Sequence, residues 1–174
     1  MFGRIALVAA SAALLSSPVV KTVSAQKLDD PTIVAIFDAA NTWDMEASKI
    51  AETKGTTKDV RDLAKMFVRD HGQVRQQGRD LAKKLKVTPT PPKDFALAKT
   101  HAEAMKKLES LKGKAFDKYY LENEVAYHKA VIDAVTTTLL PAIQNAELKD
   151  LVVKVAPAFK AHQDAAQNLL NKQS

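Results

Sequence analysis

The chain of 174 residues contains no cysteine and only five glycines, and 6% of its residues are aromatic. Without thiols it cannot form disulfides, carry out thiol catalysis, bind a cysteine-held iron–sulfur cluster or build a thiolate zinc site. The few glycines form neither a phosphate-binding loop nor a Gly-x-Ser-x-Gly turn. These absences exclude most of the cofactor and catalytic classes that short motifs can identify.

The longest apolar segment, residues 5–20, lies near the start of the chain and follows a single cation, Arg4. Small residues then lead to position 25, as at a signal-peptidase cleavage site. A membrane-spanning helix needs about 20 uninterrupted apolar residues, and Lys21 ends this segment early. We therefore expect residues 1–25 to be a cleaved signal peptide and residues 26–174 to form one exported domain.

The rest of the chain is mildly basic. Removing residues 1–25 takes away Arg4 and Lys21 and lowers the formal charge from +6 to +4. An excess of this size, spread along the chain, favours neither nucleic acid nor an anionic membrane as a partner. No second long apolar segment follows, and no cysteine is present to carry a lipid anchor. The expected location is the periplasm, with another envelope protein as a candidate partner.

Segments rich in Ala, Leu, Lys and Glu, separated by short turn sequences, predict helices and few or no strands. The expected helices cover residues 29–55, 56–86, 94–111, 115–140 and 147–170. Three prolines between residues 88 and 92 cannot continue a helix and predict a crossover loop. This pattern predicts an all-α fold, an antiparallel four-helix bundle with one extra short helix.

Particular residues are expected at the helix ends. Thr56 and Asp59 have the spacing of a capping box at the start of the second helix. Gly113 is expected to end the short helix. Pro141 is expected to mark the end of its helix or a kink in it, and Pro157 is expected to bend the last helix.

All four histidines fall on the apolar face of their own predicted helix: His71, His101, His128 and His162. Histidine is uncommon at such core positions. If the three on long helices lie at the same height, they meet in the bundle interior, where bundles build metal sites. Neutral imidazoles with one or two carboxylates suit a divalent transition metal.

Nearby acids complete the candidate site. Glu46 on the first helix and Glu124, one turn before His128, are the candidate carboxylate ligands. Asp70 and His101 are candidates for a surrounding layer that orients the ligands. We therefore expect His71, His128, His162, Glu46 and Glu124 to hold the metal, with another small ligand of the histidines as the alternative.

Two other interpretations stay open. In the first, each histidine makes a buried hydrogen bond and sets the register of the bundle without any ligand. In the second, which has the least support, a buried metal makes the protein an oxidoreductase. A ferritin-type diiron site is excluded because Val68, Val125 and Phe159 replace the glutamates of its Glu-x-x-His pairs. The expected role is binding, and no residue is assigned a catalytic role.

Five segments of the sequence match the pattern of one family of exported proteins: residues 46–51, 60–71, 108–120, 128–131 and 161–162. In these segments the chain resembles the domain of unknown function 4142, whose members are often labelled outer membrane proteins. The resemblance covers nearly all of residues 26–174. It implies a ferritin-like helical bundle behind a signal peptide, and it supplies no catalytic residue.

The resemblance also bears on the candidate site. It supports Glu46 and the three histidines of the long helices as matching positions. The other matching residues are Asp70, Phe116, Asp117 and Tyr120. Glu122 falls where the family has an acid, whereas Glu124 does not clearly match one. Tyr120 and Glu122 are therefore implied as further residues around the site.

Overall fold

The computed structural model describes residues 28–92 and 95–173, and these residues form helices joined by short connections. The elements are α1 (Asp30–Lys54), α2 (Lys58–Leu85), α3 (Ala96–Ser110), α4 (Gly113–Ala134), the π-helical turn η1 (Val135–Leu139), α5 (Leu140–Ala142) and α6 (Ala146–Asn171). The predicted signal peptide falls outside the described residues.

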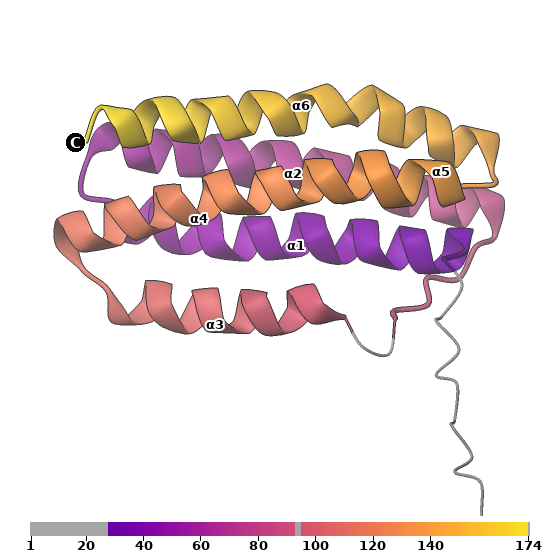
Figure 1. Cartoon of the computed structure of the whole chain (residues 1–174), viewed down its shortest axis with the longest axis horizontal. Helices are drawn as coiled ribbons and strands as arrows, with labels where there is room; N and C mark the ends of the chain where they lie inside the picture. The colour runs from indigo at the N-terminus through magenta and orange to yellow at the C-terminus, as the bar shows by residue number, and fades with distance from the viewer. Residues whose placement is uncertain (1–27, 93–94, 174) are drawn as a thin grey trace, which may run out of the picture.

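Helices α1, α2, α4 and α6 form the bundle, and α3 lies along its outside next to α1 (Figure 1). The chain runs along α1, returns along α2, and passes through α3 before it enters α4. Because α3 carries the chain back to the far end, α2 and α4 point the same way, while neighbouring bundle helices are antiparallel (Figure 1). The prediction of an antiparallel four-helix bundle with one extra short helix is confirmed.

Side-chain caps start three of the helices. Asp29 accepts a hydrogen bond from the Thr32 amide at 3.0 Å, and Asn145 caps α6 in the same way. The expected capping box at Thr56 is wrong, because Thr57 is the residue that caps α2. The backbone amide of Thr56 instead donates to the Asp117 carboxylate at 2.9 Å. This bond ties the loop between α1 and α2 to α4.

One further expectation about a helix end needs correction. Helix α3 ends at Ser110, and Gly113 begins α4 with a φ of 62°, a conformation that glycine adopts without strain. Pro157 lies inside α6, which continues past it to Asn171. Pro141 does mark a change, because α4 widens into η1 before it and the helix ends at Ala142.

The buried interior consists of two apolar clusters. One contains Ile33, Val34, Phe37, Ala82, Val135, Leu139, Ile143, Leu148, Val152, Val155 and Phe159. The other contains Ala47, Ala51, Val60, Ala64, Leu108, Phe116, Tyr120 and Leu121. Along each bundle helix, the residues between these clusters include buried polar side chains: Asn41, Asp44, His71, Glu124, His128 and His162. Apolar packing on both sides therefore holds a polar layer in the middle of the bundle.

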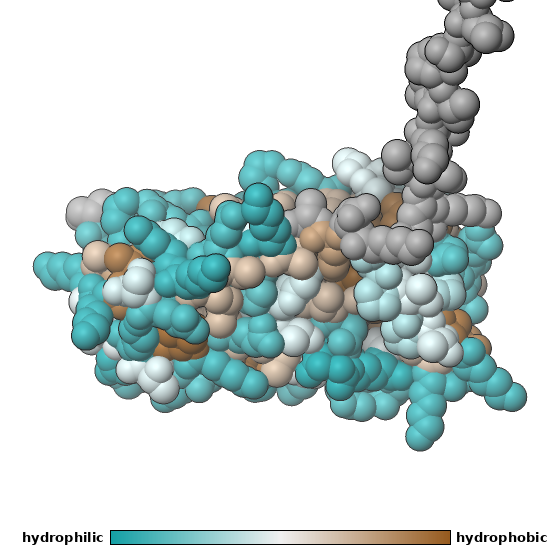
Figure 2. Space-filling view, turned by 90° about the horizontal axis from the view of Figure 1, so that it is seen from below, coloured by the Kyte–Doolittle hydropathy of each residue, from teal (hydrophilic) through white to brown (hydrophobic). Residues whose placement is uncertain are grey.

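The outer surface is mostly hydrophilic, with small and separate apolar patches on the side seen in Figure 2. Within the described residues, Val153 is the large hydrophobic side chain left most open to solvent, at 53% exposure. No described helix combines the length and the apolar composition needed to cross a membrane.

Candidate metal centre

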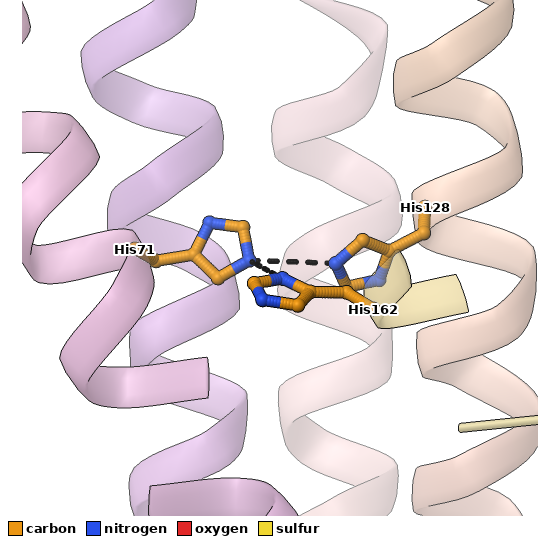
Figure 3. Close-up of side chains that lie close together, drawn as sticks. All are labelled: His71, His128 and His162. Atoms are coloured by element: carbon orange, nitrogen blue, oxygen red, sulfur yellow. Dashed lines mark hydrogen bonds between the residues drawn. The ribbon is translucent and has the colours of Figure 1, made fainter. Parts of the chain in front are cut away.

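Three of the four histidines meet in the polar layer. His71 comes from α2, His128 from α4 and His162 from α6, and none of them is more than 5% exposed. The Nε2 atom of His71 lies 3.4 Å from His128 Nε2 and 3.2 Å from His162 Nδ1, so the rings point toward one another (Figure 3). Helices distant in sequence thus bring three ring nitrogens together.

The outer nitrogens of His71 and His128 both face fixed acceptors. His71 Nδ1 lies 2.9 Å from the side-chain oxygen of Asn41, whose amide nitrogen donates to the Phe37 carbonyl at 2.8 Å. This second bond orients the Asn41 amide, so its oxygen must accept and His71 Nδ1 must donate. His128 Nδ1 donates to the backbone carbonyl of Glu124 at 2.9 Å. In both neutral rings, Nε2 therefore carries a lone pair.

His162 is oriented through its Nε2 atom, whereas His71 and His128 are oriented through Nδ1. Its Nε2 donates to the Asp70 carboxylate at 3.2 Å, and Asp70 is itself held by Arg69 at 2.8 Å. The lone pair of neutral His162 therefore lies on Nδ1, which faces His71. At each of the two inner contacts, both nitrogens carry lone pairs, and the contact needs a positive group between them.

Asp44 adds an oxygen to this cluster. The residue is 2% exposed, and its Oδ2 lies 3.3 Å from His71 Nε2 and 3.5 Å from His128 Nε2. That oxygen has no hydrogen-bond partner, whereas Oδ1 faces the Ser48 hydroxyl at 3.4 Å. Ser48 is in turn 2.9 Å from the Tyr120 hydroxyl. Tyr120 therefore supports Asp44 through Ser48.

Burial shifts the pKa of every group in the layer toward its neutral form. It lowers the pKa of His71, and it lowers that of His128 to about 4 although the Glu124 carbonyl partly opposes this. Burial raises the pKa of Asp44 to about 7, and together with the charge of Asp44 it raises that of Glu124 well above its usual value. The layer has no internal cation to balance its two carboxyl groups.

Glu124 lies next to the cluster, on the outer side of the His128 ring. Its Oε2 is 3.6 Å from His128 Nδ1, the nitrogen that faces away from His71, and this oxygen also lacks a hydrogen-bond partner. Glu124 can join Asp44 and His128 in a second group of possible ligands. The Glu124 carboxyl group therefore lies next to the cluster, whereas Asp44 faces the inner nitrogens directly.

Glu46 and His101 lie apart from the three histidines. The Glu46 carboxylate is largely exposed and contacts His101 Nε2 at 2.9 Å. The His101 ring stacks on Trp43 with centroids 5.3 Å apart, which helps hold α3 against α1. Glu122 is also exposed and pairs with Lys118. Of the other residues expected around the site, Asp70 contacts His162 directly and Tyr120 acts through Ser48.

Sequence reasoning missed Asn41 and Asp44, although a signal for both was present. They stand one helical turn apart and continue the spacing of the buried residues Phe37, Ala47 and Ser48. A polar residue on an apolar face is the same signal that identified the histidines. Glu46, two positions after Asp44, points to the opposite side of the helix, because each residue turns the helix by about 100°.

Comparison with known proteins supports the fold. A crystal structure of a DUF305 fragment from Deinococcus radiodurans resembles the chain with a TM-score of 0.72 and 12% sequence identity. The similarity covers 82% of this chain and 95% of the fragment. At this identity the comparison concerns the fold alone. No curated protein matches the chain.

A sequence model of one family matches residues 16–169, which is most of the chain. The buried histidine cluster is compatible with metal binding. The family is the one that the sequence segments resembled, and its description assigns no function. The chain belongs to the Domain of unknown function (DUF4142) family.

Proposed function

We propose that this bundle binds one divalent transition-metal ion, with His71 Nε2, His128 Nε2, His162 Nδ1 and Asp44 Oδ2 as ligands. One observation carries the proposal. Three ring nitrogens are kept unprotonated toward a common point because their outer partners hold the ring protons elsewhere. Outer hydrogen bonds of this kind are what orient histidine ligands in metal sites.

The spacing of the donor atoms supports a small tetrahedral ion. The three separations that involve His71 Nε2 are 3.2, 3.3 and 3.4 Å, and Asp44 Oδ2 lies 3.5 Å from His128 Nε2. Ligand atoms at the corners of a tetrahedron, each about 2.0–2.1 Å from zinc, lie about 3.3 Å from one another. These four separations match the edge of such a tetrahedron, and the three histidine nitrogens all lie within 4.8 Å of one another.

The charges of the layer also favour a divalent ion. Three neutral imidazoles carry no charge, and burial raises the pKa of Asp44 and Glu124, so that without an ion these carboxyl groups favour their neutral forms. A divalent cation would favour the ionised forms of both carboxyl groups and balance their two negative charges in a region where an unbalanced charge is costly. Imidazole-rich sites suit zinc, copper, nickel and iron, whereas calcium and magnesium prefer oxygen ligands. We infer that the bundle holds a transition metal.

Metal titration of one matched pair of variants tests this proposal. Untagged protein is stripped with a chelator and titrated with Zn(II), Cu(II), Ni(II) and Co(II), with stoichiometry measured by elemental analysis and affinity by calorimetry. We expect one equivalent per chain, an affinity reduced at least tenfold in His162→Gln, and an unchanged affinity in His101→Gln. Binding of no metal, or equal affinities in the two variants, would refute the proposal.

We also propose that the protein works in the periplasm after removal of residues 1–25. The support is the order of features at the start of the chain, with one cation, an apolar segment and small residues at position 25. Intact-mass measurement of the protein from fractionated cells tests this. A chain beginning at Gln26 in the periplasmic fraction is expected, and a full-length chain in the cytoplasm would contradict it.

A further inference from the structure

A small apolar cavity lies beside the histidine cluster. Its volume is about 40 Å³, and almost all of its lining surface is apolar. Bundle helices, η1 and Leu97 of α3 surround it, and its lining includes the rings of His71 and His128. One side of the proposed metal centre therefore faces a cavity instead of packed side chains.

The polar side chains around this cavity have no free donor to offer a water molecule. The Tyr127 hydroxyl donates to the Ala40 carbonyl at 2.8 Å. The Asn41 amide donates to the Phe37 carbonyl. The ring N–H groups of His71 and His128 donate to Asn41 and to the Glu124 carbonyl, away from the cavity. The cavity is partly open to the protein surface, and because its lining offers a water molecule few hydrogen-bond partners it favours an apolar guest.

The π-helical turn η1 forms one wall of the cavity. Val135 and Leu139, its first and last residues, both line it. Pro141 cannot donate to the carbonyl four residues earlier and crowds it, which accounts for a widened turn at this position. The Leu140 amide instead donates to Val135, and the Thr137 hydroxyl donates to the Asp133 carbonyl at 2.6 Å. Such single π turns inside α-helices occur often at functional sites.

The size of the cavity limits its occupant. A single water molecule needs a cavity of about 10–15 Å³, so 40 Å³ admits a diatomic molecule. Pockets for organic ligands are far larger, at about 300–1,000 Å³. We propose that this cavity binds one small uncharged diatomic gas molecule, of the class of dioxygen or nitric oxide, against the imidazoles of His71 and His128. The contact with a bound metal rests on the proposed function, whereas the cavity itself does not.

Xenon is a suitable probe because it is apolar, has a similar size and scatters X-rays strongly. Crystals of metal-free protein are pressurised with xenon, and we expect one xenon atom between Ala40, Ala134 and Leu139. Ala134→Leu should fill the cavity and abolish this peak. Ala130→Leu is the matched control, because Ala130 is an exposed residue of the same helix, and this variant should leave the peak unchanged. Ordered water in the cavity, or no xenon in the unsubstituted protein, would overturn the inference.

A second measurement tests the position of the cavity relative to the metal. The ¹²⁹Xe resonance of Co(II)-loaded protein should be broadened relative to that of Zn(II)-loaded protein, because the paramagnetic ion would lie next to the gas site. Xenon binding without this broadening would overturn the contact between gas and metal. Failure to load either metal would refute the proposed function and leave the crystal result on the cavity intact.

Discussion

Asn41 is uncharged, yet it decides which nitrogen of His71 carries the proton. Its oxygen accepts from His71 Nδ1, and its own amide group is held by the Phe37 carbonyl. Replacing it with leucine removes that acceptor while keeping a similar volume. Residues that orient metal-binding histidines typically contribute about 10–100-fold to metal affinity.

We therefore expect Asn41→Leu to bind zinc about 10–100-fold more weakly than the unsubstituted protein. Competition with a chromophoric chelator measures the change. Thr42→Ala is the matched control, because the Thr42 hydroxyl bonds only to the Asp38 carbonyl within the same helix. Equal losses in the two variants would show that Asn41 acts only through the stability of α1.

Protonation of the metal-free layer should produce opposing effects on stability. His128 has a pKa of about 4 in the folded state and about 6.5 when unfolded, so acidification below pH 6.5 favours unfolding. Asp44 has a folded pKa of about 7, far above its unfolded value, so acidification below pH 7 favours folding. Each contribution amounts to about 2 kcal/mol between pH 7 and 5.

Removing either group should reveal the other contribution. On lowering the pH from 7 to 5, Asp44→Asn should lose about 2 kcal/mol more unfolding free energy than the unsubstituted protein, and His128→Gln should lose about 2 kcal/mol less. Urea denaturation in the presence of a chelator measures these values. Parallel pH curves for the three proteins would show that neither group changes its pKa on folding.

The residue scale also shows what sequence can predict about the site. The histidines stood out because a titratable ring on an apolar face is uncommon. Their convergence depends on the height at which each helix packs, which periodicity within one helix does not contain. Glu46 is an acid beside the apolar stripe of the first helix, whereas the position of Asp44 in the site depends on how α1 packs against α2 and α4.

At the scale of helices, two glycines of α2 provide a test of how closely α1 and α2 pack. A Cβ atom on Gly78 would lie 2.9 Å from the Phe37 ring, whereas one on Gly72 would meet Met45 at an ordinary 3.7 Å. Both sites gain roughly 0.5–1 kcal/mol in helix propensity when glycine becomes alanine. Only Gly78 must also accommodate a steric clash.

We expect Gly72→Ala to raise the unfolding free energy by roughly 0.5–1 kcal/mol. Gly78→Ala should lower it, because overpacking typically costs about 1–3 kcal/mol and outweighs the gain in propensity. Guanidinium denaturation of both variants measures the difference. Stabilisation by both substitutions would mean that the Phe37 ring moves aside without cost.

The helices were predicted well because apolar spacing, caps and prolines all indicated the same boundaries. The π turn was not predicted, since Pro141 permits either a kink or a helix end and the packing of Val135 and Leu139 decides between them. The cap at Thr57 was misplaced by one residue. Thr56 has the same hydroxyl but bonds to Asp117, a partner 61 residues away.

At the scale of the whole molecule, metal binding should be visible as thermal stability. A ligand at 100 times its dissociation constant stabilises the folded state by about 2.7 kcal/mol. For a domain of this size we expect the melting temperature to rise by about 5–10 °C on adding zinc. It should fall back to the metal-free value when a chelator is added. Calorimetry on the His162→Gln variant should show almost no rise, and an equal rise there would indicate binding elsewhere.

The bundle and its extra helix were predicted from the number and length of the helices. The direction of α4 relative to α2 was not, because it depends on α3 running back along the outside of α1 (Figure 1). A Pro-rich segment predicts a crossover but contains no information about which face the crossing helix covers. Side-chain pairs such as Glu46 with His101 provide that information only after folding.

Each of the four bundle helices contributes one of the four proposed ligands, and this arrangement should slow the release of the ion. An ion held in this way cannot leave by the movement of one loop, because its donors separate only when the helices do. Its release rate should therefore follow the opening of the bundle, and stay the same however much competing chelator is present. Slow release of this kind suits a protein that retains its ion over long periods, and is poorly suited to rapid transfer of ions between partners.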